Sequence, residues 1–201
     1  MEHETRSSTG LEIRAEPGQR PRLTGYAAVF NSRSLPLPLG DGREFVETIR
    51  PGTFKRSLQS DRDILAVMGH DPEAILGRRK TGSLVIGEDD RGLRFEVLLN
   101  DSDRARNLIE DVRSGNLDGM SFGFRTPLGG DRWDFTKLPL LRELVDVDIM
   151  EISVTAVPAY QRTELALRSM AAAQEEAECV LEQRDLRAKR LAAIEADLRR
   201  Q

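Results

Sequence analysis

The chain has 201 residues, of which 39% are hydrophobic and 32% are charged, and its formal net charge is −4. This composition is typical of a globular domain with extensions, and a core of about 150 residues buries roughly 70% of its unfolded surface without disulfides or metals. It excludes a membrane-spanning chain, because no apolar run approaches roughly 20 residues, and it argues against nucleic acid as the main partner.

The N-terminus is polar and has no signal peptide, and the single cysteine, Cys179, cannot form an internal disulfide. Both features predict an intracellular protein. With one cysteine and two histidines, the chain offers no cluster of soft metal ligands, so we expect neither a metal nor another cofactor.

Residues 1–20 are polar and lack apolar periodicity, so we predict a mobile leader there. Strands are expected at three positions in the next segment, namely 22–30, 44–50 and 63–68. A short helix over 51–58 starts at a proline. Further on, a hairpin is expected around 87–92, and a helix capped by Asp101 or Ser102 ends at Gly115.

The second half continues with a strand through Ser121, a turn or hairpin through Trp133, and two strand segments between residues 138 and 157. Many short strands with few helices predict an α+β fold, with a mixed, mainly antiparallel sheet closed or nearly closed into a β-barrel. We therefore place the folded domain at residues 21–168.

Residues 169–201 differ in character. The segment from Met170 to Gln201 has no Gly or Pro and is rich in strong helix formers, which predicts a charged helical tail. Its apolar stripe is thin, so a solvated helix and a coiled-coil contact with a partner are both open.

Three short segments supply, in chain order, a histidine, a serine and a carboxylate, namely His70, Ser121 and Glu151. This is the chemistry of a serine hydrolase, because a serine hydroxyl needs a base, and the base needs a third group to hold its ring. The other histidine, His3, lies in the predicted leader, so His70 is the candidate base. Taken singly, each residue is more often structural than catalytic.

Ser121 lies between large apolar residues at alternate positions, which places its side chain on the opposite face of the predicted strand. Gly119 and Gly123 remove side-chain bulk beside the hydroxyl, as a site that admits another polypeptide requires. The spacing differs from the Gly-x-Ser-x-Gly nucleophile elbow of the α/β-hydrolases.

The apolar alternation around Glu151 changes phase, since Val147 and Ile149 share one face whereas Ile152 and Val154 share the other. Such a change predicts a bulge or a strand covered on both sides, and therefore a buried carboxylate that needs a partner. His70 is the first candidate for that partner. Competing carboxylates for the same role are Asp71, Asp146 and Asp148.

The ordered succession of segments from Leu23 to Tyr160 resembles the prohead proteases of tailed bacteriophages, which are thought to share a fold with herpesvirus assemblin. The segments are LTGYAAVF at 23–30, IRPGTF at 49–54, LGR at 76–78, GSL at 82–84, EDDRGL at 88–93 and PAY at 158–160, together with those of the three chemical residues. The resemblance implies that His70 is the base, Ser121 the nucleophile and Glu151 the third member. Assemblins use a second histidine where this chain has Glu151.

The resemblance further implies a serine endopeptidase with an assemblin-like barrel, acting inside assembling proheads in the host cytoplasm. Its expected substrates are the scaffold region of the major capsid protein and its own chain, and we expect a homo-oligomer without nucleic-acid or membrane partners. The main alternative is a non-catalytic capsid scaffold or assembly protein that retains the fold, which the charged tail favours. A small-molecule esterase or amidase is a weaker alternative, because the elbow motif is absent.

Overall fold

The computed structural model describes residues 4–39 and 42–156, together with scattered positions between 170 and 187. The described strands form three sheets. Sheet A has the order β1 (Glu4–Thr9), β10 (Gly119–Arg125), β13 (Asp148–Thr155), β6 (Leu65–Met68) and β7 (Asp71–Arg78). Sheet B has the order β2 (Glu12–Arg14), β3 (Arg22–Val29), β9 (Gly92–Leu98) and β8 (Leu84–Glu88). Sheet C has the order β11 (Asp131–Asp134), β12 (Leu140–Leu144), β5 (Glu44–Ile49) and β4 (Leu37–Pro38).

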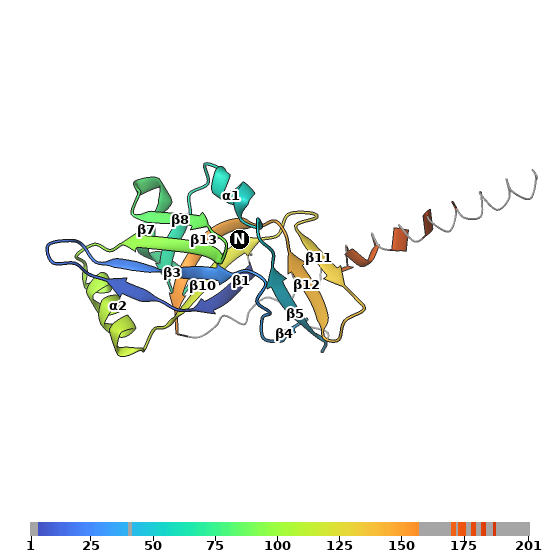
Figure 1. Ribbon diagram of the computed structural model, residues 1–201, viewed down its shortest axis with the longest axis horizontal. Coiled ribbons are helices and arrows are strands. Elements are labelled where there is room, and N and C mark those ends of the chain that lie inside the picture. Colours follow the sequence, from blue (N-terminus) through green and yellow to red (C-terminus); the bar gives the residue numbers. More distant parts are fainter. Residues whose placement is uncertain are drawn as a thin grey trace, which may run out of the picture.

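Sheets A and B lie together in one half of the molecule, and sheet C forms the other end (Figure 1). The main core lies between sheets A and B, where Phe122 and Ile152 of sheet A meet Leu23 and Phe95 of sheet B. Each of these strands contributes alternate residues, so the other face of sheet A is left for polar side chains. Sheet C has a smaller apolar cluster of its own.

Within residues 4–39 and 42–156 the helices are α1 (Lys55–Gln59), α2 (Asp103–Ser114) and a 3-10 turn at Arg79–Thr81. The Ser102 hydroxyl accepts the Ala105 N–H at 3.3 Å, and Gly115 ends α2 with a φ of 80°. The predicted cap and stop of this helix are therefore confirmed. Among the described residues, none of the helices is long and apolar enough to span a bilayer.

The expected closed antiparallel barrel is not found, because the described strands form three open sheets. Two of the strand pairs, β13 with β6 and β12 with β5, are parallel. Closure would require β7, an edge of sheet A, to lie beside a strand of sheet B. Instead the Val97 side chain points at Gly77, where a Cβ atom would lie only 2.7 Å from Val97 Cγ1. Strand β7 therefore packs over β9, and the two sheets form a sandwich.

The prediction of a leader over residues 1–20 does not agree with the structure at residues 4–14, which form β1 and β2. Strand β1 pairs with β10 along its length, from Glu4 opposite Phe124 to Thr9 opposite Gly119. The segment lacks apolar periodicity because its buried side chain Glu4 is charged, and Arg6 is half-buried. Most of the predicted tail over 169–201 lies outside the described residues, which include only scattered positions between 170 and 187.

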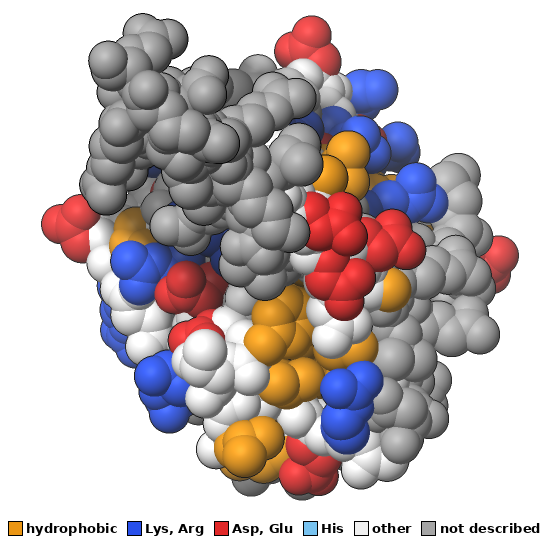
Figure 2. Space-filling view, turned by 90° about the vertical axis from the view of Figure 1, so that its right-hand side faces the viewer, with side chains coloured by type: hydrophobic (Ala, Val, Ile, Leu, Met, Phe, Trp, Pro, Cys, Tyr) orange, Lys and Arg blue, Asp and Glu red, His pale blue; other side chains and the backbone are white. Residues whose placement is uncertain are grey.

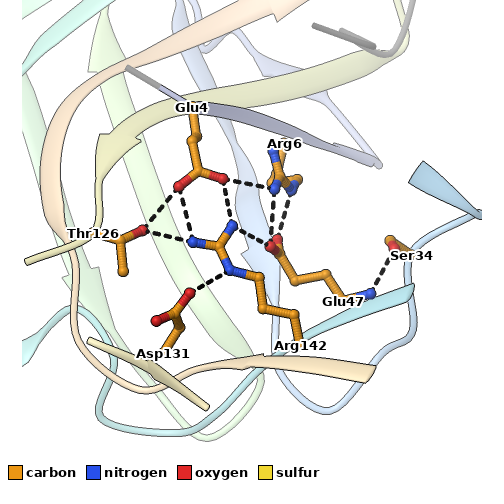
Figure 3. Close-up of polar contacts among 7 residues, drawn as sticks. All are labelled: Glu4, Arg6, Ser34, Glu47, Thr126, Asp131 and Arg142. Atoms are coloured by element: carbon orange, nitrogen blue, oxygen red, sulfur yellow. Dashed lines mark hydrogen bonds and ion pairs between the residues drawn. The ribbon is translucent and has the colours of Figure 1, made fainter. Parts of the chain in front are cut away.

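Burial of these charges depends on an ionic cluster between sheets A and C (Figure 3). Arg142 is fully buried and contacts three carboxylates, with distances of 3.0 Å to Glu4, 3.1 Å to Glu47 and 2.6 Å to Asp131. Arg6 binds Glu47 at 2.6 Å. Burial alone would lower the pKa of Arg142, but attraction to Glu4 and Glu47 outweighs it and raises this pKa. The cluster joins β1 to β5, β11 and β12.

Figure 2 shows the end of the molecule that includes sheet C, where apolar, acidic and basic side chains lie next to one another. Among the exposed large apolar residues are Leu128 and Leu138, which stand in the loops on either side of β11.

Candidate active site

The three candidate residues come from neighbouring strands of sheet A. Ser121 lies on β10, Glu151 on the adjacent β13, and His70 directly after β6, which is the next strand in the sheet. The register places Ser121 opposite Ser153 and Gly123 opposite Glu151. Cross-strand partners project from the same face, so Ser121, Glu151 and Ser153 share the face of sheet A that points away from the main core.

A bulge in β13 sets the position of Glu151. Gly123 pairs with Glu151, whereas the next residue, Phe124, pairs with Ile149, so Met150 is an extra residue in the strand. The bulge explains how Ile149 and Ile152 both reach the core while Glu151 points to the other face. Glu151 is only 8% exposed. The predicted bulge and the predicted burial of this carboxylate are both confirmed.

His70 lies in the tight turn that joins β6 to β7. Its N–H donates to the Ser153 hydroxyl at 2.8 Å, and the Gly69 N–H donates to the Val154 carbonyl at 3.0 Å. The imidazole contacts Glu151, with 2.6 Å between His70 Nδ1 and Glu151 Oε1. An ionised carboxylate only accepts hydrogen bonds, so in a contact with ionised Glu151 the proton is on Nδ1, and Nε2 of a neutral ring is then an acceptor.

Two buried polar atoms of this site are unengaged. Neither His70 Nε2 nor Ser121 Oγ has a hydrogen-bond partner in the described part of the chain. Buried polar atoms without partners are rare in folded proteins and indicate a functional role or an absent ligand. Here they are a ring nitrogen and a hydroxyl on the same side of one sheet. The structure brings His70 to Glu151, but it shows no hydrogen bond between His70 Nε2 and Ser121 Oγ.

The model of one protein family, described as caudovirus prohead serine protease, matches residues 9–176. The chain belongs to this family. The match begins inside β1 and extends beyond β13, so it includes all three candidate residues. No curated protein and no solved structure gives a significant match. Membership shows a serine protease of the phage prohead, and it agrees with the resemblance found in the sequence.

The carboxylates that competed with Glu151 are engaged elsewhere in this prohead protease. Asp146 and Asp148 both bind Arg56, at 2.7 Å and 2.8 Å. Asp71 follows His70 directly, but its carboxylate accepts the Glu73 N–H at 2.8 Å. Of the four carboxylates, Glu151 is the one whose contact with His70 is observed.

Ser153 is the polar residue of this site that sequence reasoning missed. It is fully buried, lies opposite Ser121 and binds the backbone of His70. The signal for it was the spacing Glu151-x-Ser153, because residues two apart on a strand share a face. The described residues contain no group of three or more potential metal ligands.

Proposed function

We propose that this family member is a serine endopeptidase that cleaves the scaffold region of the major capsid protein, and its own chain, inside assembling proheads in the host cytoplasm. Ser121 is the nucleophile, His70 the general base and Glu151 the group that orients His70. The observation that carries the proposal is the 2.6 Å contact between His70 and Glu151, combined with the unengaged His70 Nε2 and Ser121 Oγ.

The proposed reaction follows from the protonation state of the ring. Ser121 Oγ attacks the carbonyl carbon of the scissile peptide, and its proton passes to His70 Nε2. The resulting imidazolium keeps its proton on Nδ1 and donates a hydrogen bond to Glu151, whose negative charge stabilises the ring. His70 then gives the proton to the departing amine, leaving an ester on Ser121.

Water completes the cycle by the same route in reverse order. His70 Nε2 takes a proton from the attacking water, and the ester bond to Ser121 breaks as the proton returns to Oγ. The carboxylic acid product leaves, and the Ser121 hydroxyl and the neutral His70 ring are regenerated. Ser121 is fully buried, so the atoms that cover its hydroxyl must move before a substrate can reach it.

The test is co-expression of the chain with a capsid protein that carries its scaffold region, followed by mass spectrometry of all new chain termini. Ser121→Ala should abolish these termini, because the loss of a catalytic nucleophile lowers turnover by several orders of magnitude. Ser34→Ala is the matched control, since the Ser34 hydroxyl also contacts the backbone, accepting the Glu47 N–H at 2.9 Å, but it does so on sheet C.

Unchanged processing by Ser121→Ala would refute the assigned nucleophile. If the wild-type chain assembles with capsid protein but creates no new termini, the scaffold alternative is correct. New termini in the capsid protein alone would limit the proposal to cleavage in trans.

A further inference from the structure

We infer that Ser153 is a positioning residue, which holds the backbone of His70 so that the imidazole reaches both Glu151 and Ser121. The inference rests on the roles proposed above and adds a fourth residue to them. It begins with the turn between β6 and β7, in which Met68 pairs with Asp71. Gly69 and His70, the two central residues, have φ angles of 58° and 61°. Positive φ at both positions is the geometry of a type I′ hairpin turn.

His70 is sterically unfavourable in this turn. With φ near +60°, a side chain brings its Cβ too close to the carbonyl oxygen, which is why Gly, Asn and Asp dominate such positions. Gly69 has no such conflict. Contacts outside the turn are therefore needed to keep His70 in the left-handed conformation.

Strand β13 supplies three such contacts, from residues 151, 153 and 154. The Val154 carbonyl accepts the Gly69 N–H, the Ser153 hydroxyl accepts the His70 N–H, and Glu151 binds the imidazole. The backbone and the ring of His70 are thus fixed to the same strand. Of these acceptors, only the Ser153 hydroxyl can be deleted without changing the backbone or the partner of the ring.

Ser153 also relates the base to the nucleophile. It lies directly opposite Ser121 in the β10–β13 ladder, and both serines are fully buried. Through Ser153, the register of this ladder sets where the His70 backbone stands relative to Ser121. The Ser153 hydroxyl is already engaged by His70, whereas the Ser121 hydroxyl has no partner within the described part of the chain, which favours Ser121 as the attacking group.

The first experiment compares peptide hydrolysis by Ser153→Ala and Ser34→Ala. The Ser34 hydroxyl accepts the Glu47 N–H at 2.9 Å on sheet C, so both variants delete a serine hydroxyl that holds a backbone N–H. Both should lower Tm. Only Ser153→Ala should lower kcat, by about 10- to 100-fold with KM within about twofold, because a misplacement of about 1 Å is enough for such a loss. A kcat for Ser153→Ala equal to that of Ser34→Ala would overturn the inference.

The second experiment needs no activity. In a His3→Gln background His70 is the only histidine, so the proton NMR resonance of its Nδ1–H, hydrogen-bonded to Glu151, is assigned uniquely. We expect this resonance to shift and to exchange faster with water in Ser153→Ala, and to stay unchanged in Ser34→Ala. An unchanged resonance in both variants would overturn the positioning role.

The two experiments separate failure of the inference from failure of the proposed function. If Ser121→Ala remains active while Ser153→Ala is inactive, Ser153 is itself the nucleophile and the positioning role is wrong. If the wild-type chain hydrolyses no peptide, the proposed function fails, and the NMR comparison alone decides the role of Ser153.

Discussion

The two nitrogens of the His70 ring have different environments, and this difference suits a general base. Nδ1 is 2.6 Å from Glu151, while Nε2 is buried without a partner among the described residues. Histidine is suited to this task because it changes charge near neutral pH. In the proposed mechanism Glu151 holds one tautomer of the ring and stabilises its positive charge, and these two effects can be separated by mutation.

Glu151→Gln should lower turnover by about 10² to 10⁴, because it keeps the shape of the side chain but removes the charge that stabilises the imidazolium. The fall should be smaller than that of Ser121→Ala. Peptide hydrolysis measured with both variants under the same conditions checks this order.

The controls for this prediction are Asp146→Asn and Asp148→Asn, which remove carboxylates that bind Arg56 near the surface. We expect little change in turnover from either, because exposed ion pairs contribute little. If one of these controls, or Asp71→Asn, is as damaging as expected for Glu151→Gln while Glu151→Gln stays active, the third member is misassigned.

At the scale of elements, β1 is part of the folded unit, although it is short and polar. It covers the edge of β10, the strand that carries Ser121, and it is anchored by Glu4 in the buried ionic cluster. Burial alone would raise the pKa of Glu4, but attraction to Arg142 and the hydrogen bonds that Arg142 donates outweigh it, so this pKa lies below its usual range.

Glu4→Gln should therefore lower the free energy of unfolding at pH 7 by about 3–5 kcal/mol, because it leaves Arg142 short of compensating charge. A carboxyl whose folded pKa is depressed stabilises the protein above its usual pKa and loses this contribution as pH falls through the folded value. The wild-type chain should thus lose stability below the usual carboxyl range more steeply than Glu4→Gln. Chemical denaturation across this pH range measures both effects.

Glu12→Gln on β2 serves as the control, because Glu12 pairs with Arg14 and both side chains are exposed. Its free energy of unfolding should stay within about 0.5 kcal/mol of the wild type. Equal effects of Glu4→Gln and Glu12→Gln would show that the cluster does not anchor β1.

At the scale of the whole molecule, Met170, which lies beyond β13, contributes to the smaller apolar cluster of sheet C. Met170 is 4% exposed and packs with Leu39, Phe45 and Leu140 in the smaller core. The family match extends to residue 176, beyond the boundary at residue 168 that the sequence suggested. We propose that the remaining tail recruits the capsid protein and takes no part in hydrolysis.

Two truncations test this division. A chain of residues 1–176 should keep the Tm and the peptide hydrolysis of the full chain, but it should enter proheads less efficiently. A chain of residues 1–169 also loses Met170, and its Tm should fall by about 5 to 15 °C, because deleting a buried methionine leaves a cavity. Loss of peptide hydrolysis by the soluble 1–176 chain would show that the tail belongs to the active domain.

The sequence by itself determined the features that depend on neighbouring residues. The cap and stop of α2, the hairpin between β8 and β9, and the bulge beside Glu151 follow from local patterns. His70 was singled out because the other histidine lay in a polar segment. Ser121 and Glu151 were singled out by the faces of their strands. The sequence predicted that Glu151 is buried and needs a partner, with His70 as the first candidate. The structure shows this contact.

Only the tertiary structure decided the features that join distant parts of the chain. Arg142 and Glu4 are 138 residues apart, and their burial depends on the ionic cluster that they form with Arg6, Glu47 and Asp131. Polar composition therefore indicated a mobile leader where the structure has β1 and β2. The open sandwich replaced the expected barrel because periodicity shows which face of a strand is buried but not which strands are neighbours. Ser153 was missed for the same reason: its role exists only where β13 runs beside both β10 and β6.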